Sequence, residues 1–276
     1  MFTLDDVTVA FGNRTALAVD KMRLDAGATV ALMGSNGAGK TTLLRLLAGL
    51  LVPTTGAVCK DCEITVGYVS QDHSPHAYMP MTVDEVLTIG RYRRRGLLGR
   101  MRSSDHQAMD RAAEQLRIGD LRKRSFGQLS GGQRRRVLIA AALASQSDCL
   151  LLDEPITGLD IPSQDIVVEV LEAERLRNKL VVLSTHHLSE ACLCERIVLL
   201  KGGVLADGRP EEVLGEKNIA AAFGENALTR LELGEGNGAS SILVLEEHDH
   251  CIDSSFGRVS HVAGESLWSI GPRERW

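Results

Sequence analysis

A glycine-rich loop in the first fifth of the chain has the residue types that bind a phosphate group. The run "GSNGAGKTT" consists of Gly34, Ser35, Asn36, Gly37, Ala38, Gly39, Lys40, Thr41 and Thr42. Its first eight residues fit the pattern G-x-x-x-x-G-K-[ST] in full. Glycines let such a loop wrap a phosphate and aim backbone N–H groups at it, and the helix that follows adds its positive dipole end. We expect Lys40 to reach the β- and γ-phosphates of a nucleotide and Thr41 to bind Mg²⁺.

A pair of acids supplies the other half of a hydrolytic site. Asp153 and Glu154 end the apolar run "CLLLDE". Asp153 can hold Mg²⁺ directly or through water, and Glu154 can polarise a water for attack on the γ-phosphate. Acids also occur at strand ends because the chain reaches water there, but the phosphate loop favours the catalytic interpretation. The two features predict an ATPase or GTPase, and the lack of an "NKxD"-like base-reading segment counts against a GTPase.

A third motif looks like a second phosphate-binding corner. The stretch "LSGGQ", Leu129 to Gln133, lies at the start of an apolar helical run. With this motif the sequence resembles the ATP-binding cassette (ABC) ATPases over roughly residues 1–224. The resemblance has six elements in the family's order: the phosphate loop, Gln71 in "YVSQ", "LSGGQ", "LLLDEP", "GLD" ending at Asp160, and His186 in "LSTHH".

The resemblance explains why one chain carries two phosphate corners, because in this family the second corner serves a different ATP. Two subunits pair head to tail, and each caps the γ-phosphate held by the other's phosphate loop. The capping residues implied here are Ser130, Gly131, Gly132 and Gln133. ATP then joins the two faces, and hydrolysis opens them again.

The resemblance also assigns roles to residues outside these loops. Gln71 would contact Mg²⁺ or the attacking water near the membrane partner, and His186 would bind the γ-phosphate and hold the water of Glu154. Asp160 would reach across the dimer. Phe11 would stack on adenine, and the less favoured alternative is that this aromatic residue belongs to the core. The implied catalytic set is therefore Glu154, His186 and Gln71, and the implied Mg²⁺ ligands are Thr41, Gln71 and Asp153.

The elements that must position these residues predict an α/β fold: a P-loop NTPase core with a parallel-rich sheet. Apolar strand patterns at 28–34, 64–70, 149–154 and 179–185 alternate with helical patterns at 40–50 and 163–177. The stretch 3–11 reads as an edge strand of an antiparallel N-terminal β part, and 196–208 as a hairpin. Helical patterns at 82–90, 103–118 and 131–144 predict an inserted α-helical subdomain at about 80–145. Residues 1–224 would form the ABC ATPase domain, and 225–276 an extension of unknown role with possible strands at 241–247 and 257–263.

Composition limits the partners and the cellular location that we expect for this domain. A net charge of −5 argues against a nucleic-acid partner, and the six scattered cysteines fit reduced thiols. The start "MFTLDD" does not resemble a signal peptide, and the run "VLIAAALA" is too short to span a bilayer. We therefore expect a cytoplasmic protein that is peripheral on the inner face of the cell membrane.

Three smaller features keep two interpretations each. The arginines between 91 and 102 form a basic run that is either a solvated loop or a contact with lipid or permease. Cys59 and Cys62 form a lone CxxC, which is either a pair of ordinary thiols or a metal or redox site; the first is favoured because a zinc site needs four ligands. The group His248, Asp249, His250 and Cys251 is either a polar turn or a zinc-sensing tail.

The stretch 79–116 resembles the helical subdomain of importers for zinc, manganese and iron chelates, and "DEPITGLD" is nearer the zinc and manganese branch. This resemblance implies a homodimeric ATPase subunit with integral-membrane permease subunits and an extracytoplasmic substrate-binding protein. The alternatives are an ATPase subunit of an efflux system and a regulatory ABC ATPase outside transport. His187 and Ala141 depart from the family pattern, where aspartate and arginine are usual.

Overall fold

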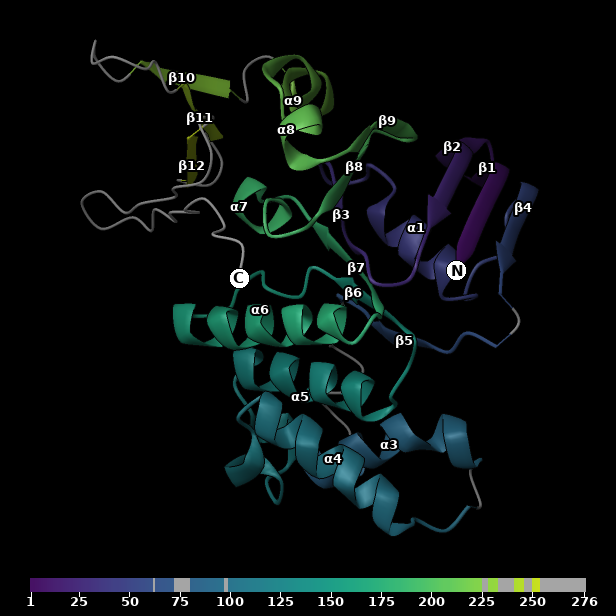
Figure 1. Ribbon diagram of the computed structural model, residues 1–276, viewed down its shortest axis with the longest axis vertical. Helices are drawn as coiled ribbons and strands as arrows, with labels where there is room; N and C mark the ends of the chain where they lie inside the picture. Colours follow the sequence, from purple (N-terminus) through teal and green to yellow (C-terminus); the bar gives the residue numbers. More distant parts are fainter. Residues whose placement is uncertain are drawn as a thin grey trace.

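The computed structural model describes residues 1–61, 63–71, 80–96, 99–224, 228–232, 241–245 and 250–253, with 93–95 and the last three ranges described as backbone only. Its centre is a six-stranded sheet of order β5-β6-β7-β3-β8-β9 (Figure 1). Five strands are parallel, and β9 is antiparallel to β8. The bounds are β3 Thr29–Met33, β5 Val66–Val69, β6 Cys149–Asp153, β7 Leu180–Thr185, β8 Arg196–Leu200 and β9 Val204–Gly208. The predicted parallel-rich sheet and the hairpin are confirmed.

The strands of this sheet are apolar on both faces because a separate hydrophobic core packs against each face. Along β6, Leu150 and Leu152 pack in one core and Leu151 packs in the other. The first core contains residues of α5 (Gly131–Ala144), α6 (Ile161–Leu176) and α7 (Leu188–Ala191). The second contains residues of α1 (Lys40–Leu47) and of a separate β-sheet.

That separate sheet consists of β2 (Arg14–Leu24), β1 (Phe2–Phe11) and β4 (Thr55–Lys60), in this spatial order and all antiparallel. The predicted antiparallel N-terminal part is present. The expectation that β1 is an edge strand is wrong, because β4 pairs with its second side. Alternating apolar residues Phe2, Leu4, Val7 and Val9 bury one face of β1 against the core.

Between 80 and 145 the described chain holds helices and turns and no strand, as the sequence predicts. Helices α3 (Val83–Arg95) and α4 (Ser103–Gln115) pack on α5, with short turns η1 (Gly119–Leu121) and η2 (Phe126–Gln128) between α4 and α5. Thr82 and Glu85 form a capping box that fixes the start of α3. A buried ion pair between Arg91 and Asp105 joins α3 to α4.

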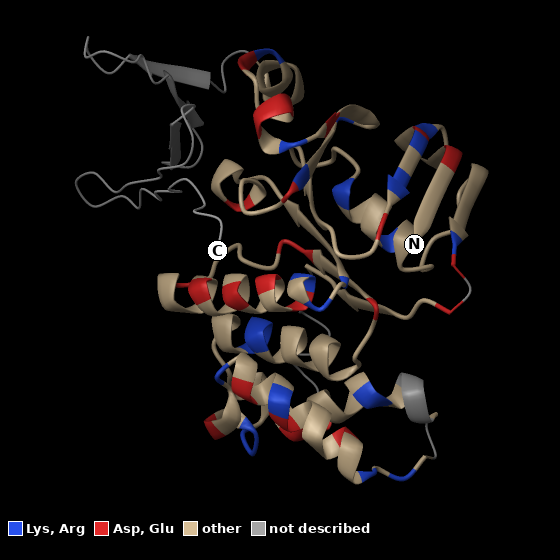
Figure 2. Ribbon diagram, in the orientation of Figure 1, with Lys and Arg blue, Asp and Glu red and all other residues tan. Residues whose placement is uncertain are grey.

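The chain continues from β9 into α8 (Pro210–Val213) and α9 (Glu216–Phe223). Beyond them lies a small antiparallel sheet of β10 (Leu228–Glu232), β11 (Ser241–Leu245) and β12 (His250–Asp253). β11 matches the first part of the strand pattern at 241–247, and 257–263 lies outside the described residues. Figure 2 shows acidic and basic residues mixed over the described helices. Within the described ranges, no helix is long and apolar enough to cross a membrane.

Candidate functional site

The phosphate loop joins the end of β3 to the start of α1, as predicted. Gly34 has φ 153°, and a Cβ there would lie 2.4 Å from the carbonyl oxygen of Leu200. Gly39 has φ 104°, and a Cβ there would lie 2.9 Å from the carbonyl oxygen of Ala16. Gly39 is also the N-cap of α1 and provides no side chain to bind the first N–H groups of the helix. The loop therefore presents backbone donors at a helix N-terminus, where an anion is stabilised.

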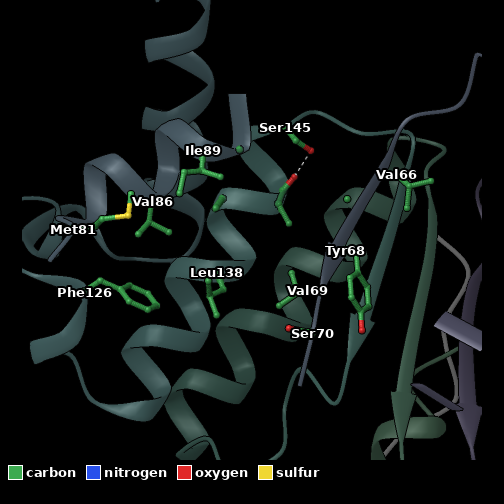
Figure 3. Close-up of a pocket in the computed structure, with 14 residues that line it drawn as sticks. Val66, Tyr68, Val69, Ser70, Met81, Val86, Ile89, Phe126, Leu138 and Ser145 are labelled. Carbon is green, nitrogen blue, oxygen red and sulfur yellow. Dashed lines mark hydrogen bonds between the residues drawn. The ribbon is translucent and has the colours of Figure 1, made fainter. Parts of the chain in front are cut away.

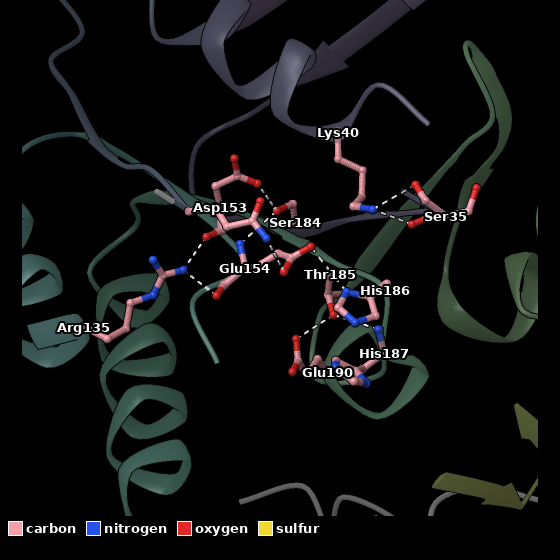
Figure 4. Close-up of polar contacts among 12 residues, drawn as sticks. Ser35, Lys40, Arg135, Asp153, Glu154, Ser184, Thr185, His186, His187 and Glu190 are labelled. Carbon is pink, nitrogen blue, oxygen red and sulfur yellow. Dashed lines mark hydrogen bonds and ion pairs between the residues drawn. The ribbon is translucent and has the colours of Figure 1, made fainter. Parts of the chain in front are cut away.

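Lys40 is buried and folds back over this loop. Its Nζ donates hydrogen bonds to the carbonyl oxygens of Gly34 at 2.5 Å and Ser35 at 3.1 Å (Figure 4). Burial lowers the pKa of Lys40, and the negative charges of Glu154 and Asp153 partly oppose this shift. The ammonium group thus lies at the loop and within the field of both predicted acids.

Asp153 ends β6 and is only 1% exposed. Its Oδ1 accepts a hydrogen bond from Ser184 Oγ at 2.5 Å, whereas its Oδ2 is buried without a hydrogen-bond partner. A buried, unpaired carboxylate oxygen is unfavourable unless a cation or donor satisfies it. Helix α1, with the half-buried Thr41 in its first turn, packs against β6. A hard divalent cation with oxygen ligands fits this donor set.

The three residues predicted to be catalytic lie together. Glu154 follows Asp153 and is also buried. Its Oε2 accepts a hydrogen bond from Gln71 Nε2 at 2.9 Å, and its Oε1 lies 3.3 Å from His186 Nδ1. Gln71 and His186 therefore hold this carboxylate from the ends of β5 and β7, the two strands that flank β6.

Three polar side chains of the site were missed by sequence reasoning. Ser184, fully buried in β7, accepts a hydrogen bond from the Glu154 N–H at 2.9 Å and donates to Asp153. Glu190, buried in α7, accepts from Thr185 Oγ1 at 2.5 Å. Burial, with a contribution from the charge of Glu154, raises the pKa of Glu190 to about 7, against the Thr185 hydrogen bond and the charge of Arg135.

The third is Arg135 of α5, whose guanidinium donates to backbone carbonyls next to Gln71 and at Glu154. In the sequence it stands between two other arginines, Arg134 and Arg136, and arginine side chains are mostly exposed. A signal was available, because Arg135 lies four residues before the buried Ile139 and therefore on the same side of the helix.

The second phosphate corner lies at the N-terminus of α5. Ser130 and Gln133 form a capping box, with N-to-oxygen distances of 3.1 and 3.2 Å. In the described chain no hydrogen bond joins this corner to the phosphate loop, and α1 and α5 belong to opposite faces of the central sheet (Figure 1). The two corners are therefore separate features of one chain. Asp160 lies beside the second corner, since a Cβ on Gly132 would be 3.8 Å from its Oδ1.

Phe11 is 58% exposed at the end of β1, which excludes the alternative that it belongs to the core. Asn36 and Gly37 are exposed, and Ser35 and Thr42 are half-buried, whereas Ala38 is buried. The ring of His187 packs against that of His186 in a tilted arrangement, with ring centroids 4.1 Å apart. Ala141 lies under Gly90 of α3, where a Cβ on the glycine would be 2.1 Å from the Ala141 carbonyl oxygen.

An apolar cavity of about 290 Å³ lies next to Gln71 (Figure 3). Its walls come from β5, α3, α5 and η2, and include Val69, Val86, Ile89, Phe126 and Leu138. Ile89 of α3, which lines this cavity, is 46% exposed. The residue before Gln71, Ser70, lines the cavity, so the cavity adjoins the chain where it reaches Gln71.

The smaller sequence features are settled in part. Arg91 is buried and paired with Asp105, so its inclusion in a solvated or lipid-facing run is wrong. Arg100 and Arg102 are exposed. Cys59 is exposed and free, and Cys62 lies outside the described residues, as do His248 and Asp249. Within the described ranges no group of three or more His, Cys, Asp or Glu residues could hold a metal ion.

Comparisons with known proteins agree with this geometry. The ABC transporter family model matches residues 17–157. The chain is 35% identical over 231 residues to the chelated iron transport system membrane protein YfeB of Yersinia pestis, covering 80% of this chain and 78% of that one. It is 31% identical over 232 residues to the manganese transport system ATP-binding protein MntA of Synechocystis sp., with 80% and 89% covered. It is 31% identical over 233 residues to the zinc import ATP-binding protein ZnuC of Photobacterium profundum, with 83% and 86% covered.

Solved structures give the same result. A chain from an ABC transporter described as of metal-chelate type, in an inward-facing conformation, aligns with a TM-score of 0.74 and 28% identity over 88% of this chain and 96% of that one. A dimeric ATP-binding cassette in a post-hydrolysis state, bound to ADP and phosphate, aligns with a TM-score of 0.64 and 26% identity, covering 76% and 99%.

Proposed function

The chain belongs to the ABC transporter family and is an ATP-binding ATPase subunit, and we propose that it powers the import of a divalent metal ion, zinc or manganese. The observation that best supports ATP hydrolysis at this site is the contact of Glu154 with both Gln71 and His186, at the strand end beside the phosphate loop. The names of the manganese and zinc relatives support the cargo.

In this proposal the phosphate loop binds the ATP phosphates through its N–H groups and Lys40. The residues of the cradle are Gly34, Ser35, Asn36, Gly37, Ala38, Gly39, Lys40, Thr41 and Thr42, and the exposed ring of Phe11 stacks on adenine. Nucleotide would draw the Lys40 ammonium away from the carbonyls of Gly34 and Ser35, since phosphate oxygens are stronger acceptors for a cation.

Thr41, Asp153 and Gln71 would hold Mg²⁺, with the unpaired Oδ2 of Asp153 as the anionic ligand. The ion would neutralise charge on the β- and γ-phosphates. Glu154 would accept a proton from the attacking water, and Gln71 and His186 would fix the direction of its carboxylate. His186 would also contact the γ-phosphate.

We further propose that two copies pair around two ATP molecules. Ser130, Gly131, Gly132 and Gln133 of one copy would then cap the γ-phosphate bound by the other, and Asp160 beside them would contact the partner. The separation of the two corners within one chain supports this arrangement. The Ser130 hydroxyl, which now caps its own helix, would turn toward the phosphate.

The membrane part of the transporter would be a pair of permease subunits, with a substrate-binding protein outside the cell. The apolar cavity beside Gln71, with the exposed side chain of Ile89 in its wall, suits a short apolar segment of a permease. The chain would then be peripheral on the inner face of the membrane. Residues 1–224 form the ATPase domain in this proposal, with the helical subdomain at about 80–145 inserted and 225–276 as an extension.

The test is cellular metal content in cells carrying the wild-type chain or Lys40→Ala, grown with limiting zinc and manganese. A selective fall of zinc or manganese in the variant would support import and identify the cargo. A fall of iron alone would assign the chain to chelate import, as for the Yersinia relative. A rise in the metal would contradict import and indicate efflux.

A further inference from the structure

Arg135 is a charged side chain in the core that the proposed chemistry does not use. It lies in the second turn of α5 and is 4% exposed. Its Nη1 donates to the carbonyl oxygen of Ser70 at 2.9 Å, and its Nε donates to that of Pro155 at 3.3 Å. Its Nη2 donates to the carbonyl oxygens of Asp153 and Glu154 (Figure 4).

These carbonyls lie at the end of β6 and in the segments that follow the adjacent parallel strands β5 and β6. Gln71 follows Ser70 directly, so the guanidinium anchors the backbone on both sides of the Gln71–Glu154 hydrogen bond. A planar guanidinium with five donors can span such a set of acceptors, whereas a lysine ammonium cannot.

The backbone at Glu154 needs such anchoring. Its φ of 51° lies in the left-handed region, which is unfavourable for a residue with a Cβ. Its N–H is held by Ser184 Oγ, and its carbonyl is held by Arg135. The backbone conformation at Glu154 therefore depends on two side chains, and only Arg135 comes from α5, the helix that Ser130 caps.

The positive charge of Arg135 is a second reason for its importance at this site. Burial lowers the pKa of Arg135 to about 10, and the nearby carboxylates Asp153, Glu154 and Glu190 oppose this shift. The guanidinium thus stays protonated at neutral pH. It balances negative charge at the end of β6 from the side opposite the phosphate loop.

We propose that Arg135 is a positioning residue for ATP hydrolysis, which links the helix that caps the partner's ATP to the Glu154 and Gln71 of its own subunit. Ser130 and its neighbours would move α5 when they bind the partner's nucleotide. Because Arg135 belongs to α5, this movement would shift Glu154 and Gln71 and so change the position of the attacking water. The inference rests on the proposed function, because it requires ATP hydrolysis in a head-to-tail dimer.

The test uses the full-length chain with Arg135→Gln and Arg135→Lys, and Arg136→Gln as the matched control. Arg136 is the next residue of α5, and it donates instead to the carbonyls of Leu116 and Arg117, away from the site. ATPase rates against ATP concentration give kcat and KM. ATP-dependent dimerisation is measured separately in the Glu154→Gln background, and thermal unfolding is recorded for every variant.

We expect both Arg135 variants to lose kcat on the order of 100-fold, as for a misplaced catalytic group, with little change in KM. The lysine variant should fail although it keeps the charge and remains folded. Both should still dimerise with ATP in the Glu154→Gln background, and Arg136→Gln should keep the wild-type kcat.

Wild-type kcat in Arg135→Gln or full recovery in Arg135→Lys would overturn the inference. A KM that rises in parallel with the loss of kcat, or an equal loss of kcat in Arg136→Gln, would also overturn it. Absence of ATP hydrolysis by the wild-type chain would instead refute the proposed function, so the two failures are distinguishable.

Discussion

The side-chain amide of Gln71 donates a 2.9 Å hydrogen bond to Oε2 of Glu154, across the gap between two loops. Gln71 follows β5 and Glu154 follows β6, and these strands are neighbours in the sheet although the residues are far apart in sequence. The carboxyl ends of parallel strands meet at one edge, where α/β folds place their ligand sites. The position of the segment after β5 is thus linked directly to the carboxylate of Glu154, the proposed general base.

Gln71→Ala should lower kcat by roughly tenfold or more while leaving ATP affinity nearly unchanged, because the carboxylate of Glu154 loses one of its two orienting contacts. Steady-state ATPase kinetics and binding of a fluorescent ATP analogue measure the two quantities separately. An unchanged kcat would mean that His186 alone orients Glu154.

Ser184→Ala should cost about 1–3 kcal/mol of unfolding free energy, because it leaves the Glu154 N–H and the Asp153 Oδ1 without their buried partner. It should also raise the Mg²⁺ concentration needed for half-maximal ATPase activity. Ser145→Ala is the control, since that hydroxyl donates only within the end of its own helix, to Ala142. Equal effects of the two substitutions in urea unfolding would contradict this role for Ser184.

Glu190 gives a pH dependence with a definite sign. Its pKa is raised from 4.5 to about 7, mainly by burial, so the folded state binds its proton more tightly than the unfolded state. The contribution of this tighter proton binding to the free energy of unfolding is full below pH 4.5 and is lost as the pH rises through about 7. Glu190→Gln keeps an acceptor for Thr185 and does not titrate. Its stability relative to wild type should therefore rise with pH over this window, by up to roughly 3 kcal/mol. A flat difference in urea unfolding from about pH 4 to pH 8 would contradict the raised pKa.

The ion pair of Arg91 and Asp105 should matter far more than its exposed counterpart. Its side chains are 4% and 1% exposed, against 74% and 55% for Arg23 and Asp25. Asp105→Asn leaves a buried guanidinium without its counter-charge and should cost about 3–5 kcal/mol. Asp25→Asn should cost less than about 1 kcal/mol. Thermal unfolding of both variants checks the contrast, and similar losses would refute it.

Much of this site could be predicted from local sequence. The apolar runs that end in Gly34 and Asp153 predict buried parallel strands, and the motifs at their ends predict what meets there. The contact of Gln71, Glu154 and His186 follows from the rule that carboxyl ends of parallel strands share an edge.

The rest depends on packing between distant segments. β1 was expected at an edge because nothing in residues 3–11 indicates that β4, far along the chain, pairs with its second side. Helical spacing places Arg135 on the side of the buried Ile139, but only the position of Ser70 and Glu154 in space makes it an anchor for two backbone segments. Ser184 looks like an ordinary strand residue until its two partners are placed beside it.

The central claim is that ATP joins two copies of the chain and that hydrolysis assisted by Glu154 separates them. The most direct measurement is the oligomeric state of Glu154→Gln by light scattering with Mg²⁺ and either ATP or ADP. We predict a dimer with ATP only, together with an ATPase rate reduced by on the order of a hundredfold or more. A monomer with ATP, or hydrolysis at the wild-type rate, would contradict the account.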